Sequence, residues 1–317
     1  MKKRYLIATL VVLSVISLAI GVRSVSLVDI FYGNNEVLDI LWLSRIPRLA
    51  SIIFAGFAMS ISGLIMQQLA RNKFVSPTTA TTLDAAKLGI LFALVLFPTS
   101  NSITKMLVVF VFSLISTMLF LGLLNHIKFK NAIFIPLLGL MLGGIIDSVT
   151  TFFAYQFNLI QGINTWLQGD FSMVIKGNYE LLFITIPLVI LAFLYAHRFT
   201  LAGMGEDFAT NLGLKYNQII VIGLVIVALL SSVVVITVGV IPFLGLIIPN
   251  IVSIYRGDNI RNSLWETALL GAIFLLACDI LGRVIIFPYE ISIGMMVGVI
   301  GTAVFLFLLV RRKPNEA

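Results

Sequence analysis

Charged residues are scarce in this sequence. Lysine, arginine, aspartate and glutamate together make up 11% of its 317 residues, whereas ordinary soluble domains contain about a quarter. Hydrophobic residues make up 60%, and the mean hydropathy is +1.09. Because a water-soluble core cannot absorb this much apolar surface, the composition predicts a chain whose main solvent is lipid.

Other absences exclude several classes of function. The single cysteine, Cys278, lies in an apolar run, which excludes an internal disulfide and a cysteine-based metal site. There is no Gly-x-x-x-x-Gly-Lys-Ser/Thr, no His-Glu-x-x-His and no Gly-x-Ser-x-Gly sequence, so we expect no P-loop and no catalytic or metal site. The net charge is +7, but the basic residues lie in short loops without a continuous patch. We therefore expect no nucleic-acid partner.

Long apolar runs dominate what is present. A bilayer core takes roughly 20 apolar residues per helix, and fewer for a short or partly buried one. Ten runs qualify: 5–22, 48–69, 83–97, 103–124, 132–155, 179–197, 217–240, 242–255, 265–286 and 292–310. No small-x-small cleavage pattern follows the first run, so we interpret it as a retained helix. The sequence predicts an all-α, polytopic transmembrane bundle of about ten helices, with residues 1–317 as a single domain.

The distribution of basic residues predicts the orientation. If the N-terminus is cytoplasmic, fourteen of the 21 lysines and arginines lie in inner loops, six lie outside, and Lys87 lies within a span. This asymmetry favours cytoplasmic N- and C-termini.

Two outer arginines run against that bias. Arg45 and Arg48 flank Pro47 and are three residues apart, which predicts a shared face on the first turn of a helix. Arg283 lies near the outer end of another run. Taken alone, the residues favour interaction with lipid phosphates, with docking of an acidic external partner as the alternative.

One cytoplasmic loop, 198–218, has a helical pattern of its own. Glu206 and Asp207 suit a first turn, and Gly213 suits a helix end. Phe208 and Leu212 are four residues apart and form one apolar face. A cytoplasmic protein partner is slightly favoured over a helix lying on the membrane, because anionic lipid repels the acidic pair.

Three carboxylates lie within apolar runs: Asp84, Asp147 and Asp279. Carboxylates inside a membrane are costly and are candidates for function. Proton coupling and a structural role both remain open, with the structural role favoured. An intramembrane aspartyl protease is weaker, because no Gly-x-Gly-Asp sequence is present.

Three long stretches resemble the FecCD/BtuC-type permease subunits of iron–siderophore and cobalamin ABC importers. They are "RIPRLASIIFAGFAMSISGLIMQQLARNKFVSP" (45–77), "GVIPFLGLIIPNIVSIYRGDN" (239–259) and "ALLGAIFLLACDILGRVIIFPYEISIGMMVGVIGTAVFLFLLVRR" (268–312). The variant "RNKFVSPTT" resembles the subgroup that handles catecholate siderophores such as petrobactin. The resemblance implies the type II ABC importer fold in a bacterial cytoplasmic membrane, with a second permease subunit, either a copy or a paralogue.

The resemblance also implies partners and site residues. An external siderophore-binding protein would dock on Arg45, Arg48 and Arg283. A cytoplasmic ATPase dimer, which would hold the ATP and magnesium, would contact a coupling helix at about 203–213, with Gly205, Glu206, Asp207, Leu212 and Gly213. The translocation gate would include Asn72 and Phe74, although Asn72-Lys73-Phe74 replaces the family's Asn-Pro-Leu, and Asn250 stands where a histidine is usual.

We therefore expect a non-catalytic, cofactor-free permease subunit that translocates ferric siderophore, of the catecholate type. The alternative is a proton-coupled secondary transporter that uses Asp147 or Asp279.

Overall fold

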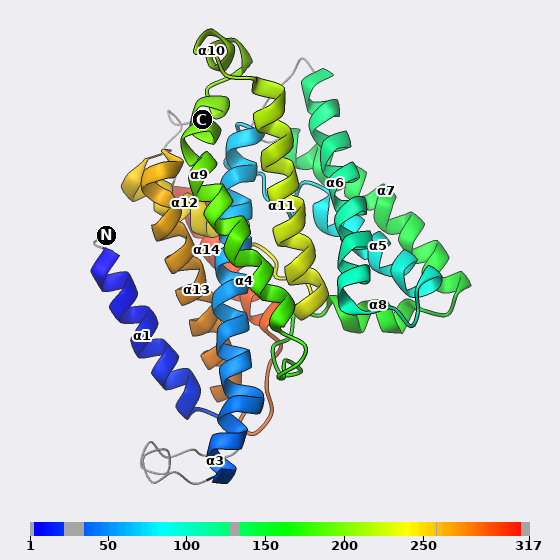
Figure 1. Ribbon diagram of the computed structural model, residues 1–317, viewed down its shortest axis with the longest axis vertical. Coiled ribbons are helices and arrows are strands. Elements are labelled where there is room, and N and C mark those ends of the chain that lie inside the picture. Colours follow the sequence, from blue (N-terminus) through cyan, green and yellow to red (C-terminus); the bar gives the residue numbers. More distant parts are fainter. Residues whose placement is uncertain (1–2, 22–34, 127–133, 258, 312–317) are drawn as a thin grey trace.

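The computed structural model describes residues 3–21, 35–126, 134–257 and 259–311, and these are helical with no β-strand (Figure 1). The longer helices are α1 (Lys3–Ala19), α4 (Ile46–Leu69), α5 (Thr82–Leu96), α6 (Ser102–His126), α7 (Phe134–Gln156), α9 (Thr185–Gly203), α11 (Tyr216–Val238), α12 (Leu244–Arg256), α13 (Ile260–Val284) and α14 (Ile293–Arg311). The shorter ones are α3 (Asn35–Ile40), η1 (Leu41–Arg45), α8 (Ile160–Leu167), η2 (Glu180–Ile184) and α10 (Glu206–Asn211).

The ten longer helices overlap the ten predicted spans; the predicted ends at 22 and 132–133 lie outside the described residues. Six helical segments of the described chain are long and apolar enough to cross a membrane. They are Leu38–Leu69, Ser102–Leu124, Phe134–Gln156, Glu180–Gly203, Tyr216–Val238 and Ile260–Val284. The fold class predicted from the sequence, a polytopic helical membrane protein, is therefore confirmed.

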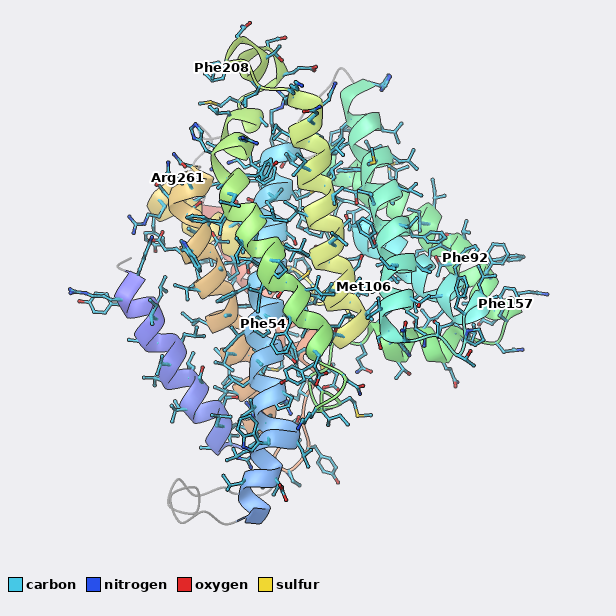
Figure 2. All side chains as sticks on the ribbon, viewed as in Figure 1. Phe54, Phe92, Met106, Phe157, Phe208 and Arg261 are labelled. Carbon is cyan, nitrogen blue, oxygen red and sulfur yellow. The ribbon has the colours of Figure 1, made fainter. Side chains whose placement is uncertain are left out.

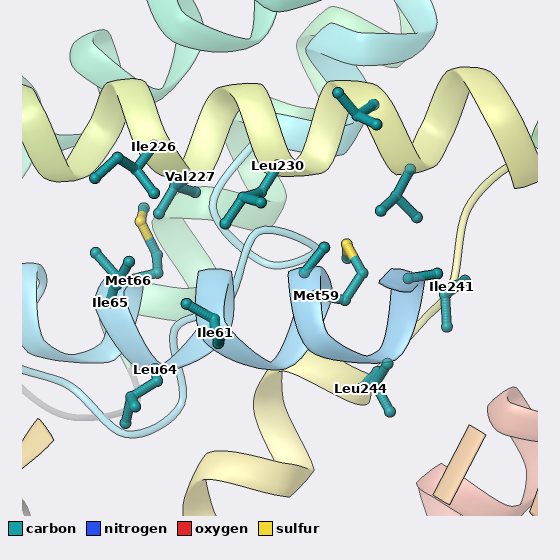
Figure 3. Packing of buried hydrophobic residues seen from close by; sticks show 14 of the residues in the cluster. Met59, Ile61, Leu64, Ile65, Met66, Ile226, Val227, Leu230, Ile241 and Leu244 are labelled. Atoms are coloured by element: carbon teal, nitrogen blue, oxygen red, sulfur yellow. The ribbon is translucent and has the colours of Figure 1, made fainter. Parts of the chain in front are cut away.

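Helix α4 is the centre of the bundle. Figure 1 shows α1 and α13 on one side of it and α11, α6, α5 and α7 on the other. The α4 side chains Met59, Ile61 and Ile65 are at most 1% exposed, and Figure 3 shows this part of α4 packed along α11, beside Val227 and Leu230. Apolar packing rather than exclusion of water holds such helices together in lipid, so close fit matters.

Small residues bring the other neighbours of α4 close. At Gly56 a Cβ atom would lie 2.6 Å from the Cα of Ala272 on α13. At Gly63 a Cβ would collide with the backbone of Gly245 on α12. Glycines at these two positions therefore allow the backbones of α12 and α13 to approach α4 directly, as small residues do at interfaces between transmembrane helices.

Helix α12 is short because an irregular segment precedes it. The chain leaves α11 at Gly239 (φ 81°), and α12 starts only after Phe243 (φ 59°). The intervening backbone is satisfied from elsewhere: Val240 N–H donates to the carbonyl of Leu167 at 3.1 Å, and Val238 accepts from Asp170 N–H at 2.9 Å. Irregular backbone at membrane depth requires partners of this kind.

The helical path that contains Arg45 and Arg48 begins earlier than predicted. Helix α4 itself starts at Ile46 with Pro47 in its first turn, as predicted, but the π-helical η1 and α3 continue the helical path back to Asn35. A proline in this position gives no N–H to the carbonyl four residues earlier, that of Leu43. The backbone N–H of Lys176 donates to this carbonyl at 3.0 Å, which ties the loop before η2 to the start of α4.

Candidate functional site

The first candidate site lies where α1, α4 and α13 meet. We call Arg45, Arg48, Asp279, Arg283 and Glu290 the arginine cluster. Asp279 on α13 has a side chain only 2% exposed, and its Oδ1 accepts hydrogen bonds from Arg48 Nε at 3.2 Å and Nη2 at 2.8 Å. Arg283 Nη2 forms an ion pair with Asp279 Oδ2 at 2.6 Å. The buried carboxylate is therefore shared by two arginines from different helices.

Two of the arginines hold the end of α1. Arg283 donates through Nη1 to the carbonyls of Ser17 (3.0 Å) and Ile20 (2.9 Å), and through Nη2 to Ser17 Oγ (2.6 Å). Arg45 donates to the carbonyls of Leu18 and Ala19. The last carbonyls of a helix lack partners within it and carry partial negative charge, so cationic donors stabilise them. Although Arg45 and Arg48 are three residues apart, their side chains bind different helices: Arg45 binds the end of α1, and Arg48 binds α13.

The ion pair between Arg48 and Glu290 is the most exposed ion pair of the arginine cluster. Its Nη1 donates to Glu290 Oε2 at 2.7 Å. The Arg48 side chain is 15% exposed and that of Glu290 is 26% exposed. Three arginines against two carboxylates leave the cluster with a formal charge of +1.

The second candidate site, helix α10, lies at the opposite end of the bundle from α3 and the start of α4 (Figure 1). The helix expected in this loop is confirmed, with Gly205 (φ 119°) before it, Glu206 and Asp207 in its first turn and Gly213 (φ 79°) after it. Phe208 is 47% exposed and Leu212 is 55% exposed. Figure 2 shows Phe208 projecting at this end, and about half of this apolar face is left uncovered by the described chain.

The third candidate site is the loop after α4, which we call the gate loop (residues 70–76). Asn72 is 7% exposed, and its Oδ1 accepts a hydrogen bond from Phe74 N–H at 2.8 Å. Asn250 on α12 donates through Nδ2 to the carbonyls of Lys73 and Leu246, both at 2.8 Å. The residue that departs from the resembled family's histidine therefore fixes the gate loop to α12.

A cavity of about 460 Å³ adjoins the gate loop. Its walls come from the ends of α4 and α9, from α12 and from the start of α13. Ten of the residues that line the cavity are polar or small: Gln67, Gln68, Arg71, Asn72, Lys73, Thr200, Gly203, Ser253, Asn259 and Ser263. The gate loop thus borders a cavity with both polar and apolar walls on the α10 side of the bundle.

The carboxylates within the helices are ion-paired. Lys87 Nζ on α5 lies 3.2 Å from Asp147 Oδ1 on α7 and 3.8 Å from Asp84 Oδ1. Asp279 belongs to the arginine cluster, and Figure 1 shows α7 and α13 on opposite sides of α4. This separation argues against a catalytic pair of Asp147 and Asp279, and the ion pairs favour the structural interpretation. In the described chain no group of three or more histidine, cysteine, aspartate or glutamate residues is placed to hold a metal ion.

The sequence did not single out Glu290 or Lys87 as partners. Arg48 and Glu290 are 242 residues apart, and Lys87 and Asp147 are 60 apart. The spacing of four between Asp279 and Arg283 is the one signal in the sequence that could have identified an ion pair in the arginine cluster.

Comparison with known proteins identifies the family. The model of the FecCD transport family matches residues 9–311. The chain belongs to this family.

Relatives cover the FecCD chain almost from end to end. The petrobactin import system permease protein YclN of Bacillus subtilis is 61% identical over 313 residues, which is 99% of each chain. The ferric-anguibactin transport system permease protein FatD of Vibrio anguillarum is 39% identical and covers 89% of this chain and 94% of its own. The petrobactin import system permease protein FatD of Bacillus anthracis is 39% identical, over 99% and 93% of the two chains.

A solved structure supports the fold. A structure described as an inward-facing conformation of a metal-chelate type ABC transporter matches with a TM-score of 0.83. It covers 98% of this chain and 99% of its own at 24% sequence identity. This likeness supports the arrangement of the helices.

Proposed function

We propose that this chain is the permease subunit of an ABC importer that carries a ferric siderophore, of the catecholate-containing petrobactin type, into the cytoplasm. The observation that carries the proposal is the 61% identity to a petrobactin import permease across 99% of both chains. ATP hydrolysis then belongs to separate ATPase subunits with their own ATP and magnesium. The chain holds no cofactor of its own, and a second permease, a copy or a paralogue, completes the path.

The two ends of the bundle support this division of labour. Fourteen of the 21 basic residues lie in the loops assigned to the N-terminal side, which favours a cytoplasmic N- and C-terminus in the bacterial cytoplasmic membrane. This orientation puts α10 in the cytoplasm, where its exposed Phe208 and Leu212 would enter a groove of the ATPase. It puts the arginine cluster outside, where Arg45, Arg48 and Arg283 would attract carboxylates of the binding protein.

Contacts connect α10 with the gate loop. At Gly205, immediately before α10, a Cβ atom would lie 3.1 Å from Arg71 Nη1 in the gate loop. At Gly203 a Cβ would collide with the side chain of Gln68 at the end of α4. Movement of α10 by the ATPase would therefore displace the gate loop at Asn72 and Phe74, because packed elements do not deform independently.

Uptake by purified components tests the proposal. The permease, its ATPase and its binding protein are reconstituted in proteoliposomes, and uptake of petrobactin loaded with radioactive iron is measured. We expect uptake that requires ATP and continues when a protonophore collapses the proton gradient. Uptake driven by the proton gradient without ATP would instead establish the secondary transporter that uses Asp147 or Asp279. ATP-driven uptake of another iron chelate, with petrobactin excluded, would retain the importer and reject the substrate.

A further inference from the structure

The guanidinium of Arg48 has two edges with different surroundings. One edge, Nε and Nη2, is bonded to Asp279, whose side chain is 2% exposed. The other nitrogen, Nη1, is bonded to Glu290, whose side chain is 26% exposed. A carboxylate that approaches from outside therefore meets the Glu290 edge and not the Asp279 edge.

The other members of the cluster are poor sites for exchange. Arg283 is 5% exposed and is held by Asp279 and by Ser17 and Ile20 at the end of α1. Displacing Asp279 would leave a buried charge without its partner, which is strongly unfavourable. Glu290 can leave at a much smaller cost, because exposed ion pairs contribute little and water can solvate the released carboxylate.

The segment that carries Glu290 is exposed and is closed at its base by a hydrogen bond. Residues 285–290 are all exposed and lie between the end of α13 and the start of α14. The base of the segment is closed by a hydrogen bond from Ile291 N–H to the carbonyl of Gly282 at 3.0 Å. The tip exposes Phe287 by 64% and Tyr289 by 75%. Glu290 lies beside this closed base, so its partly exposed side chain, and not the backbone, would rotate away from Arg48 while α13 and α14 stay in place.

We propose that Glu290 occupies the place on Arg48 that a carboxylate of the external binding protein takes on docking, so that docking exchanges one carboxylate for another. This inference rests on the proposed function, and specifically on Arg48 as a docking residue. The exchange keeps the number of carboxylates around Arg48 constant. Each docking event then gains only the difference between two similar ion pairs, which favours repeated release of the binding protein. The exposed Phe287 and Tyr289 would border the incoming carboxylate and exclude water from it.

Binding measurements on the assembled complex test the exchange. The permease with its ATPase is placed in phosphatidylcholine nanodiscs, which carry no net lipid charge, and the Kd for the binding protein is measured between 50 and 500 mM salt. Four forms are compared with the parent: Glu290→Gln, Arg48→Gln, the double variant, and Asp39→Asn. Asp39 is an exposed carboxylate of α3, near the start of α4, so its removal changes the charge of this end without touching Arg48.

We expect Glu290→Gln to bind the binding protein about two- to fivefold more tightly at low salt, because the competing ion pair is gone. The gain should shrink at high salt, should exceed that of Asp39→Asn, and should vanish when Arg48→Gln is also present. Weaker or unchanged binding by Glu290→Gln, with Arg48→Gln still weakened, overturns the exchange and retains docking on Arg48. Unchanged binding by Arg48→Gln overturns the docking role of Arg48 and the exchange with it. If Glu290→Gln gains no more affinity than Asp39→Asn does, the gain comes from the overall charge of this end of the permease, and this result also overturns the exchange.

Discussion

Asn250 Nδ2 donates a hydrogen bond to the carbonyl of Lys73 at 2.8 Å and thereby joins α12 to the gate loop. We predict that Asn250→Ala loosens the loop, because a hydrogen bond of this kind contributes about 0.5–1.5 kcal/mol. Amide exchange of the peptide 71–79, which includes the N–H groups of Phe74 and Val75, should become about two- to tenfold faster. Hydrogen–deuterium exchange with mass spectrometry on the purified permease measures this rate.

Asn250→His is the matched variant, since an imidazole can still donate one hydrogen bond. Exchange in this variant should stay nearer to that of the parent. If Asn250→Ala leaves the gate-loop peptide unchanged while peptides of α12 exchange faster, the side chain serves α12 alone, through its second bond to Leu246.

Lys87 is the cation that Asp84 and Asp147 share between α5 and α7. We predict that Lys87→Met destabilises the permease, because two carboxylates then repel each other inside the bundle. The three side chains are 26–50% exposed, so we expect a loss of about 1 kcal/mol, well below that of a fully buried pair. Cys278 gives the measurement: it is the only cysteine of the chain and is 2% exposed, so a thiol-reactive dye reports thermal unfolding.

Two further variants interpret this change. Lys87→Met combined with Asp147→Asn should recover part of the lost stability, because one repulsive charge is removed. Lys176→Met is the control: it removes an exposed loop lysine and should leave the midpoint of thermal unfolding unchanged. A double variant less stable than Lys87→Met alone would show that Asp147 is needed for some contact other than the ion pair.

The sequence predicted a helix correctly wherever an apolar run is long enough to cross lipid. Runs of about bilayer length gave the ten longer helices, and the first-turn acids with Gly213 gave α10. Helices α3 and α8 were missed because, at six and eight residues, they are far too short to be recognised as runs that cross lipid. The start of α4 was predicted to within two residues, with Pro47 in its first turn, but the continuation of the helical path through η1 and α3 back to Asn35 was missed.

The arginine cluster shows what the sequence could not provide. The charges of Arg48, Asp279 and Glu290 were visible, but their pairing depends on how α4, α13 and the turn before α14 pack. The structure shows that α1 ends at Ala19 without a basic residue in its last turn. Its terminal carbonyls therefore needed donors from elsewhere, and Arg45 and Arg283 supply them.

Arg283 and Arg48 should respond differently to the same change. We predict that Arg283→Gln lowers the thermal stability of the permease more than Arg48→Gln does, because Arg283 is 5% exposed and bonded to Asp279, Ser17 and Ile20. The loss should be about 2–4 kcal/mol, detected as an earlier loss of the monodisperse peak in size-exclusion chromatography after heating. Equal losses in the two variants would mean that the contact with α1 adds nothing to the stability of the cluster.

The apolar face of α10 provides the last prediction. Leu212→Ala should weaken association with the ATPase by about tenfold, because a large side chain that is 55% exposed in the isolated chain loses the apolar area it would bury. Glu206→Ala, in the first turn, should leave ATP hydrolysis running while siderophore uptake falls, because α10 then transmits less of the ATPase movement. Parallel assays of ATP hydrolysis and siderophore uptake in proteoliposomes measure the coupling ratio.

Thr210→Ala is the matched control for both variants. Thr210 is exposed on the same helix but lies away from the face of Phe208 and Leu212, so its replacement should leave both rates unchanged. Normal coupling in both Leu212→Ala and Glu206→Ala would remove α10 from the transmission of the ATPase movement.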